Sequence, residues 1–345
     1  MLARDRGIRL LRFIVRRLLQ MIGVLLVLSL LVFFWLRALP GGPVSALLGE
    51  RATPETRAAM EKALGLDQPL PMQYLRFLNN AIHGQFGTSI AVQPGADAMQ
   101  VFLNRLPATI ELSVLALIFA LAAGIPLGYL AARHRGTFLD GGSVIISLIG
   151  VAVPVFFLAF VLKYLFAVEL HWLPLNGRQD PNLDATRVTG FYILDGIITR
   201  EYDAAWDAFK HLILPALALA SIPFAVVLRI TRASVLEVMD EDYVRTAEAK
   251  GLTNRTIRGR HIMRNAMLPV VTTIGLQVGG LLTGAVLTET VFSIAGLGDA
   301  MNVGFSQKDY PVLQILILMA ALTYVVVNLL VDIAYAYLDP RVRTR

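Results

Sequence analysis

The side chains best placed to make specific polar contacts gather between Asp240 and Arg264. This segment lies between two long apolar runs in a chain of 345 residues. It opens with three acidic residues, continues through a centre of small residues and ends in a basic stretch. A membrane-bound chain that keeps such a helix-forming polar segment offers charges and hydrogen bonds to a partner. The chemistry that this pattern favours is recognition of another surface.

Residue patterns for catalysis, metal binding or nucleotide binding are absent from the sequence. A phosphate-binding P-loop needs Gly-Lys followed by Ser or Thr. None of the lysines follows a glycine; they are Lys62, Lys163, Lys210, Lys250 and Lys308. There is no H-E-x-x-H or G-x-S-x-G, no cysteine, and the 5 histidines lack metal-ligand spacing. We therefore expect no catalytic residue, no metal site and no cofactor bound by this chain.

The elements that must position the polar segment are membrane helices. Hydrophobic residues make up 56% of the chain and charged residues 16%, and the mean hydropathy is +0.63. The chain is more hydrophobic and less charged than a soluble domain, which predicts an all-α polytopic membrane protein with six transmembrane helices. The apolar runs lie near 14–36, 109–131, 143–168, 211–230, 266–291 and 312–335.

The distribution of charge predicts the orientation in the membrane. Alternate loops at 1–17, 132–141, 229–264 and 338–345 hold 19 Lys or Arg residues against 8 Asp or Glu residues. Lys and Arg are retained on the cytoplasmic side, so both termini and 229–264 are expected there. The basic balance thus reflects topology, and we expect no binding to nucleic acid. The first run lacks a small-x-small cleavage site, which favours an uncleaved first span.

This topology divides the chain into three parts. Residues 1–36 form a cytoplasmic N-terminus and the first transmembrane helix, and 37–108 form an extracytoplasmic segment. Residues 109–345 form a five-helix core with cytoplasmic helices at 240–264. A second outer loop, 169–208, is rich in aromatic and acidic residues, which favours an interfacial aromatic belt with solvated acids over a metal site.

Local signals within 240–264 predict two short helices along the inner membrane face. Acidic residues fall in the first turn of the first helix, and Gly251 stands at its C′ position after Lys250. Thr253 can cap a second helix, whose basic residues are Arg255, Arg258, Arg260 and Arg264. Binding of anionic lipid headgroups would explain this second helix, but it explains poorly the acidic start and glycine stop of the first.

The segment Asp242-Tyr-Val-Arg-Thr-Ala-Glu-Ala-Lys-Gly-Leu252, with Arg264-Asn-Ala266 and Leu268-Pro269, resembles the EAA loop of ABC importer permeases of the dipeptide and oligopeptide group. Further matches are Leu106-Pro-Ala-Thr-x-Glu-Leu112, Gly124-Ile-Pro-Leu-Gly128, Trp172-Leu-Pro174, Gly296-Leu-Gly298, Asn328-Leu-Leu-Val-Asp332 and Leu338-Asp-Pro-Arg341. The Glu-Ala-Ala of the broader family is Arg245-Thr246-Ala247 here, which is usual in the peptide group. The resemblance leaves out the extreme N-terminus and 178–208.

The resemblance implies a type I ABC importer permease of the bacterial plasma membrane. It implies a heterodimer with a second, similar permease, two cytoplasmic ATPase subunits that bind ATP and Mg²⁺, and an extracytoplasmic solute-binding protein. The ATPase-docking residues carried over from the EAA loop are Asp242, Tyr243, Arg245, Thr246, Ala247, Glu248, Ala249, Lys250, Gly251 and Leu252. Di- or oligopeptide is the expected cargo, with nickel and glutathione as alternatives, since relatives carry them.

Two other function classes compete with an ATP-driven permease. A self-contained secondary carrier or channel would need charges at mid-membrane depth or internal repeats, and the sequence has neither. Lys163, Glu111 and Glu289 stand toward the outer ends of spans. An intramembrane enzyme would need a paired nucleophile and base within the spans. The polar positions Gln277, Thr283 and Thr288 on the fifth span are candidates for lining the pathway.

Overall fold

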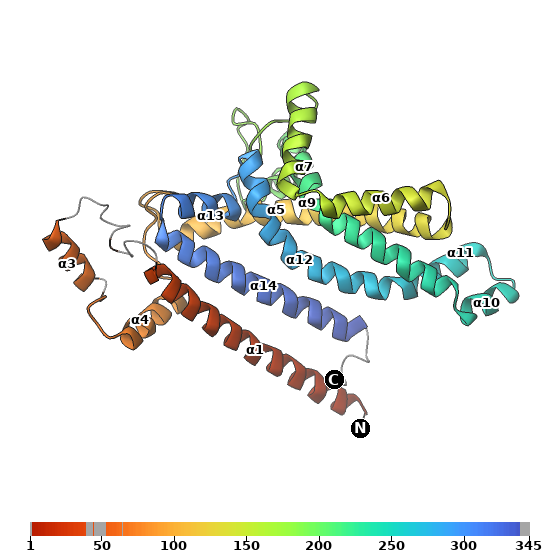
Figure 1. The fold of residues 1–345 in the computed structure, drawn as a ribbon, viewed down its shortest axis with the longest axis horizontal. Coiled ribbons are helices and arrows are strands. Elements are labelled where there is room, and N and C mark those ends of the chain that lie inside the picture. Colours follow the sequence, from red (N-terminus) through yellow and green to blue (C-terminus); the bar gives the residue numbers. More distant parts are fainter. Residues whose placement is uncertain (1, 39–43, 45–52, 64, 339–345) are drawn as a thin grey trace. The chain divides into compact units, whose positions relative to one another are not determined.

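The structure, a computed structural model, describes residues 2–38, 44, 53–63 and 65–338. These residues form helices joined by turns and loops (Figure 1). The α-helices are α1 (Leu2–Ala38), α3 (Pro54–Ala63), α4 (Leu70–Ile82), α5 (Ala98–Arg133), α6 (Phe138–Ala152), α7 (Val155–Leu162), α8 (Tyr192–Ile198), α9 (Tyr202–Met239), α10 (Asp242–Ala249), α11 (Asn254–Thr256), α12 (Arg264–Phe292), α13 (Leu297–Ser306) and α14 (Tyr310–Leu338). Two π-helical stretches are η1 (Lys163–Glu169) and η2 (Ile257–Met263).

The six predicted apolar runs all lie on long or paired helices. Among the described residues, four stretches are long and apolar enough to cross a membrane: Val15–Trp35, Ala98–Arg133, Tyr202–Met239 and Tyr310–Leu329. Two bent pairs bring the number to six if each pair is one span: Phe138–Ala152 with Val155–Glu169, and Asn254–Leu281 with Ala285–Phe292. The chain therefore has the all-α polytopic membrane fold that its composition predicts.

The third predicted run, 143–168, is broken in the structure. Its two halves, α6 and α7 with η1, meet at an angle of 105°. The break falls at Val153 and Pro154, where Pro154 precedes the first residue of α7. Proline has no N–H to donate and its ring crowds the preceding turn, which favours a break at Pro154 and a new helix after it. The apolar run is therefore two helical parts joined by a bend.

One compact unit contains residues 1–107 and 295–329 of the chain. Its core joins α1, the start of α5, α13 and α14 through residues such as Val32, Val101, Ala300 and Leu313. The turn at 89–92 closes around the fully buried Asp309, whose Oδ2 accepts from the Ser89 hydroxyl and three successive backbone N–H groups at 2.6–3.0 Å.

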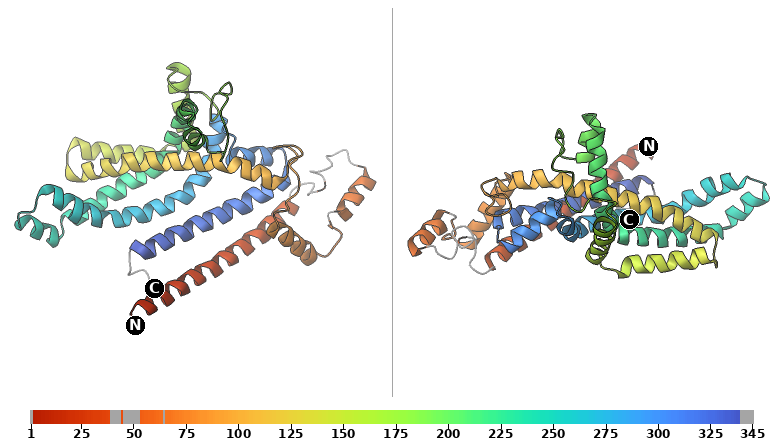
Figure 2. Two further views of the ribbon diagram at one scale, coloured as in Figure 1. Left: turned by 180° about the vertical axis from the view of Figure 1, so that it is seen from behind. Right: turned by 90° about the horizontal axis from the view of Figure 1, so that it is seen from above.

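The second compact unit contains residues 108–294 and 330–340, and α9 lies at its centre. This helix packs against α6, α7, α8 and α12 and stays continuous through Pro215 and Pro223 (Figure 2). The glycines of the Gly124-x-x-x-Gly128 stripe lie against α9. A Cβ on Gly128 would stand 2.7 Å from the Leu228 carbonyl oxygen, so only glycine permits this approach. The stripe packs within the chain.

Candidate functional site

Helix α10 has the glycine stop that its sequence predicts, but of the three acidic residues expected in its first turn only Asp242 lies there, since Asp240 caps the end of α9. It begins at Asp242, after Glu241, and ends before Lys250. Gly251 has a φ of +70°, the left-handed conformation that favours glycine. The Gly251 N–H donates to the Glu248 carbonyl at 2.9 Å, and the Leu252 N–H donates to the Ala247 carbonyl at 3.3 Å. These bonds satisfy carbonyls that the helix end would otherwise leave free.

One face of α10 is buried in the chain's own core. Val244 and Ala247 pack into a cluster with Ala132 of α5, Val235 of α9, Ile257 and Ile262 of η2, and Ala266 of α12. The small centre of the helix, which the sequence offers as part of a partner surface, therefore allows close packing on its own chain. The Ala247 side chain is buried within the chain's own core.

A side-chain bond joins the two ends of the polar segment. The Asn265 amide Nδ2 donates to the Tyr243 hydroxyl at 2.8 Å and to the His261 carbonyl at 3.0 Å. Tyr243 lies on α10 and Asn265 in the first turn of α12. The chain between Tyr243 and Asn265 therefore folds back on itself, so that α10 lies against the start of α12.

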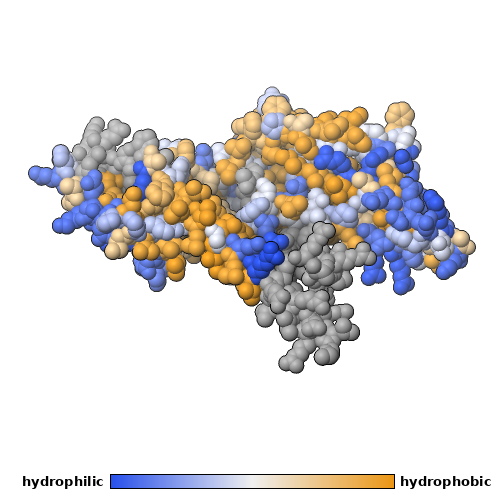
Figure 3. Space-filling model, turned by 60° about the horizontal axis from the view of Figure 1, so that its bottom comes forward, coloured by the Kyte–Doolittle hydropathy of each residue, from blue (hydrophilic) through white to orange (hydrophobic). Residues whose placement is uncertain are grey.

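The opposite face of α10 is exposed and polar. Arg245 and Asp242 form a loose pair at 3.6 Å, with side chains 69% and 97% exposed. The exposed positions of the segment are Asp242, Tyr243, Arg245, Thr246, Glu248, Ala249, Lys250, Gly251 and Leu252. Figure 3 shows hydrophilic residues gathered over the end of the unit where α10 and α11 lie. A fixed backbone thus presents charges and hydrogen-bonding groups to the outside.

The second predicted helix does not stand alone. Thr253 caps it as expected, since its Oγ1 accepts from the Thr256 N–H at 3.4 Å. The helix then continues through η2 directly into α12. No glycine turn or proline separates Thr256 from Arg264, so nothing in the sequence ends the helix before the membrane span. The segment contains one short helix and the basic extension of a long one.

The proposed pathway residues lie in different surroundings along α12. Thr288 is fully buried, and its neighbour Glu289 accepts from the Thr109 hydroxyl at 2.6 Å. Gln277 is partly buried, and its Nε2 is buried without a hydrogen-bond partner among the described residues. The side chain of Thr283 lies outside the described residues. These positions share a helix, and the structure brings no cluster of them together.

A buried polar network in the 176–201 loop went unrecognised in the sequence. Glu111 of α5 accepts from Arg178 Nη2 at 2.5 Å and from the Ile193 N–H at 2.8 Å. Asp195 is fully buried and accepts from the Thr189 N–H and hydroxyl and from the Gly190 N–H at 2.6–3.0 Å. The expectation that the acids of this loop are solvated was wrong for Asp195. Glu111 inside an apolar run was the available signal.

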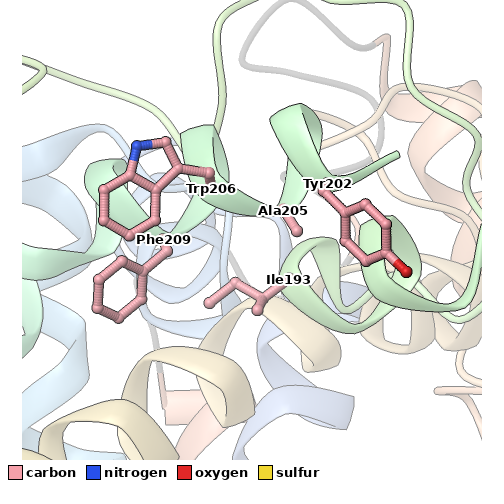
Figure 4. Close-up of a pocket in the computed structure, with 5 residues that line it drawn as sticks. All are labelled: Ile193, Tyr202, Ala205, Trp206 and Phe209. Carbon is pink, nitrogen blue, oxygen red and sulfur yellow. The ribbon is translucent and has the colours of Figure 1, made fainter. Parts of the chain in front are cut away.

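The exposed aromatic residues of the same region border an apolar hollow of about 340 Å³ (Figure 4). Ile193, Tyr202, Ala205, Trp206 and Phe209 line it, and Trp206 stacks on Phe209 with ring centroids 5.5 Å apart. These side chains provide no charge for a peptide terminus. Among the described residues, no group of three or more His, Asp or Glu side chains could hold a metal ion.

Comparison with known proteins places this geometry in a family. Residues 124–344 match the family described as binding-protein-dependent transport system inner membrane component, and residues 10–113 match its N-terminal part. The chain is 44% identical over 337 residues to the dipeptide transport system permease protein DppB of Escherichia coli, covering 96% of this chain and 99% of that protein.

Two further relatives match over similar lengths. The di/tripeptide transport system permease protein DppB of Pseudomonas aeruginosa is 44% identical over 334 residues, and the dipeptide transport system permease protein DppB of Alkalihalophilus pseudofirmus is 41% identical over 333 residues. Each alignment covers 96% of this chain and 99% of the relative.

Proposed function

Since the chain belongs to the family of binding-protein-dependent transport system inner membrane components and is a permease subunit of a peptide ABC importer, we propose that α10 is the surface on which an ATPase subunit docks. The chain is a multi-pass protein of the bacterial inner membrane. In this family, partner ATPases use the ATP and Mg²⁺ that power transport.

The observation that carries this proposal is the two-sided character of α10. Its apolar face is buried in the chain's core, and the Tyr243–Asn265 bond holds it against α12. Its other face leaves Arg245, Glu248 and Lys250 exposed. A force applied to those exposed groups would reach α9 and α12 through packed side chains, because close-packed interiors transmit displacement.

The remaining partners follow from the family. A second, homologous permease completes the pathway, two ATPase subunits dock on the cytoplasmic side, and an extracytoplasmic binding protein delivers di- or oligopeptides. That binding protein would contact 53–103, 178–208 and the loop at Gly296-Leu-Gly298. Gln277, Thr283 and Thr288 remain proposed pathway positions, and both termini are proposed to lie in the cytoplasm.

Reversal of one exposed charge on α10 tests the docking surface. Glu248→Arg should reduce co-purification of the ATPase subunits and peptide uptake by about tenfold, the effect of roughly 1.4 kcal/mol at an interface. Glu61→Arg on the exposed face of α3, on the opposite side of the membrane in the proposed topology, is the control for ATPase binding and should leave co-purification of the ATPase subunits unchanged. Normal uptake and normal ATPase binding by Glu248→Arg would remove the docking proposal.

A substitution on the buried face separates docking from helix placement. Ala247→Glu puts a carboxylate into the apolar cluster under α10, which burial makes costly. It should uncouple ATP hydrolysis from uptake by displacing α10, while the chain still inserts into the membrane. Wild-type uptake by this variant would contradict a role for the position of α10 in coupling.

Cysteine labelling tests the orientation, since the native chain contains no cysteine. Thr253→Cys and Asp184→Cys place single thiols at exposed positions of the two polar regions. An impermeant maleimide should label Asp184→Cys from outside and Thr253→Cys only after the membrane is opened. Labelling of both from one side would refute cytoplasmic placement of 229–264.

Reconstituted uptake tests the need for a binding protein. The importer in liposomes should take up little peptide until the solute-binding protein is added. Fast, saturable uptake at low peptide concentration without it would support a self-contained carrier.

A further inference from the structure

Helix α4 packs one aromatic face against α1. The ring of Phe33 lies 5.3 Å from that of Tyr74 and 5.7 Å from that of Phe77, measured between centroids. Both helices belong to the same compact unit. This contact involves one side of α4, centred on Tyr74, Phe77 and Ala81. The other sides of α4 do not face α1.

A second apolar face of α4 is largely uncovered by the described residues. Leu75 is 59% exposed and Ile82 is 74% exposed. With Pro71 and Leu78 they stand at i, i+4, i+7 and i+11, which is one stripe along a helix. The third side carries Arg76, Asn79 and Asn80, together with the exposed Met72. Exposure of such an apolar stripe to water is unfavourable and indicates contact with a protein or a membrane.

The depth of α4 follows from its partners on α1. The Tyr74 hydroxyl is hydrogen-bonded to the Ser29 hydroxyl at 2.8 Å. Ser29 lies within the apolar span Val15–Trp35, six residues before its end. At 1.5 Å per residue, that position is about 9 Å inside the end of the span. Since α1 crosses the membrane, the part of α4 beside Ser29 lies within the same leaflet.

Polar contacts mark where α4 meets the surface of that leaflet. Arg37, in the last turn of α1, donates from Nε and Nη2 to Gln73 Oε1 at 3.1 and 3.0 Å. Gln73 Nε2 donates to the Leu66 and Gln68 carbonyls at 2.9 and 2.7 Å. A guanidinium at the end of a span stays at the headgroup level. This level is therefore close to the start of α4.

We propose that α4 is an interfacial helix, with Pro71, Leu75, Leu78 and Ile82 in contact with lipid acyl chains. The leaflet is the one at the C-terminal end of α1, which is the outer leaflet on the proposed topology. Its polar side, with Arg76 and Asn79, faces the headgroups, as in other helices that lie in the plane of a membrane. The helix ties the 53–103 segment to the bilayer surface.

Spin labelling of single cysteines tests this placement in the assembled importer, reconstituted in phosphatidylethanolamine and phosphatidylglycerol vesicles. Labels at Leu75→Cys and Ile82→Cys should collide several-fold more with oxygen, relative to a water-soluble nickel chelate, than labels at Arg76→Cys and Asn79→Cys. The matched controls lie on the same helix, on its polar side. Retained peptide uptake shows that each variant is assembled.

Two outcomes would overturn the proposal. One is equal accessibility to the nickel chelate at all four positions. The other is water-exposed labels at Leu75→Cys and Ile82→Cys that become protected only when the binding protein is added, which would identify the stripe as a protein-docking surface. The unmodified chain gives an independent measurement with a phospholipid that carries a diazirine in its acyl chain. Labelling of 70–82 as well as α1 supports the proposal, and labelling of α1 alone contradicts it.

Discussion

The 176–201 loop and the 240–264 segment use the same residue types in opposite ways. Arg178 and Glu111 approach to 2.5 Å with both side chains 8% exposed, whereas Arg245 and Asp242 stand 3.6 Å apart in the open. In the loop, Arg178 and Asp195 are buried, and their hydrogen bonds hold the backbone. In the segment, apolar groups hold the backbone and the charges face outward. Charge that is buried and paired builds structure, while charge on a fixed helix is available for recognition.

The largest effect should come from breaking the buried pair. Glu111→Ala leaves the Arg178 guanidinium buried without its carboxylate and removes the acceptor of the Ile193 N–H. We expect a loss of about 3–5 kcal/mol in the stability of the loop. Hydrogen exchange at the amides of 189–198 measures it. Asp242→Ala, which removes the exposed carboxylate, is the control, and equal effects of the two would invalidate the contrast between the regions.

A smaller loss is expected at Asp195. Asp195→Asn preserves size but turns charge-assisted hydrogen bonds from Thr189 and Gly190 into weaker ones and places an amide N–H₂ against an N–H donor. We expect a cost of roughly 2 kcal/mol, seen as faster exchange at 188–198 with little change at 242–250. Unchanged exchange in the loop would show that the carboxylate does not organise it.

Acid should loosen the loop through the same carboxylate. Burial by itself raises the pKa of Asp195, but hydrogen bonds from Thr189, Val188 and Gly190 outweigh it and lower the pKa below its usual value. The stability contributed by Asp195 is therefore complete above about pH 4, the ordinary Asp value, and is lost as pH falls through the lowered pKa. The protection of the amides of 188–198, measured relative to their intrinsic exchange rates at each pH, should be constant from neutral to mildly acidic pH, and its loss in stronger acid should be smaller in Asp195→Asn.

At the end of α10, Gly251→Ala should cost about 1–2 kcal/mol, because Gly251 is left-handed and a Cβ is unfavourable there. The space around it is open, so the effect comes from the backbone alone. Gly259→Ala, at a helical glycine in equally open space, should be neutral or slightly stabilising. Exchange at 242–252 and the coupling of ATP hydrolysis to uptake measure the difference.

The smallest effect on stability is expected at Arg245. Its exposed pair with Asp242 contributes little to folding, so Arg245→Ala should leave exchange in α10 unchanged. If the exposed face binds an ATPase subunit, the same variant should still reduce co-purification of that subunit. A variant that loses helix stability and ATPase binding together would show that Arg245 has a structural role.

Local signals in the sequence were sufficient for much of the cytoplasmic segment. The glycine stop of α10 at Gly251 and the Thr253 cap involve residues within a few positions of one another, so nearby chemistry decides them. The caps of α3 are similar, since Thr53 Oγ1 accepts from the Thr56 N–H at 3.3 Å and Gly65 follows the helix with a φ of +67°.

Contacts between residues far apart in the chain could not be predicted from such local signals. Whether Ala247 faces a partner or the chain's own core depends on Ala132 and Ala266, which lie on other helices. The pairing of Glu111 with Arg178 joins positions 67 residues apart. The Gly124–Gly128 stripe predicts close packing against another helix, but only the tertiary structure identifies that helix as α9.

The sequence by itself determined the membrane class, the six apolar runs and the resemblance of the polar segment, because hydropathy and short motifs are properties of neighbouring residues. Only the tertiary structure decided which polar groups are buried, where Pro154 breaks a run, and which face of α10 remains exposed. Burial depends on what packs against a residue, and in this chain the packing partners come from helices far apart in the sequence.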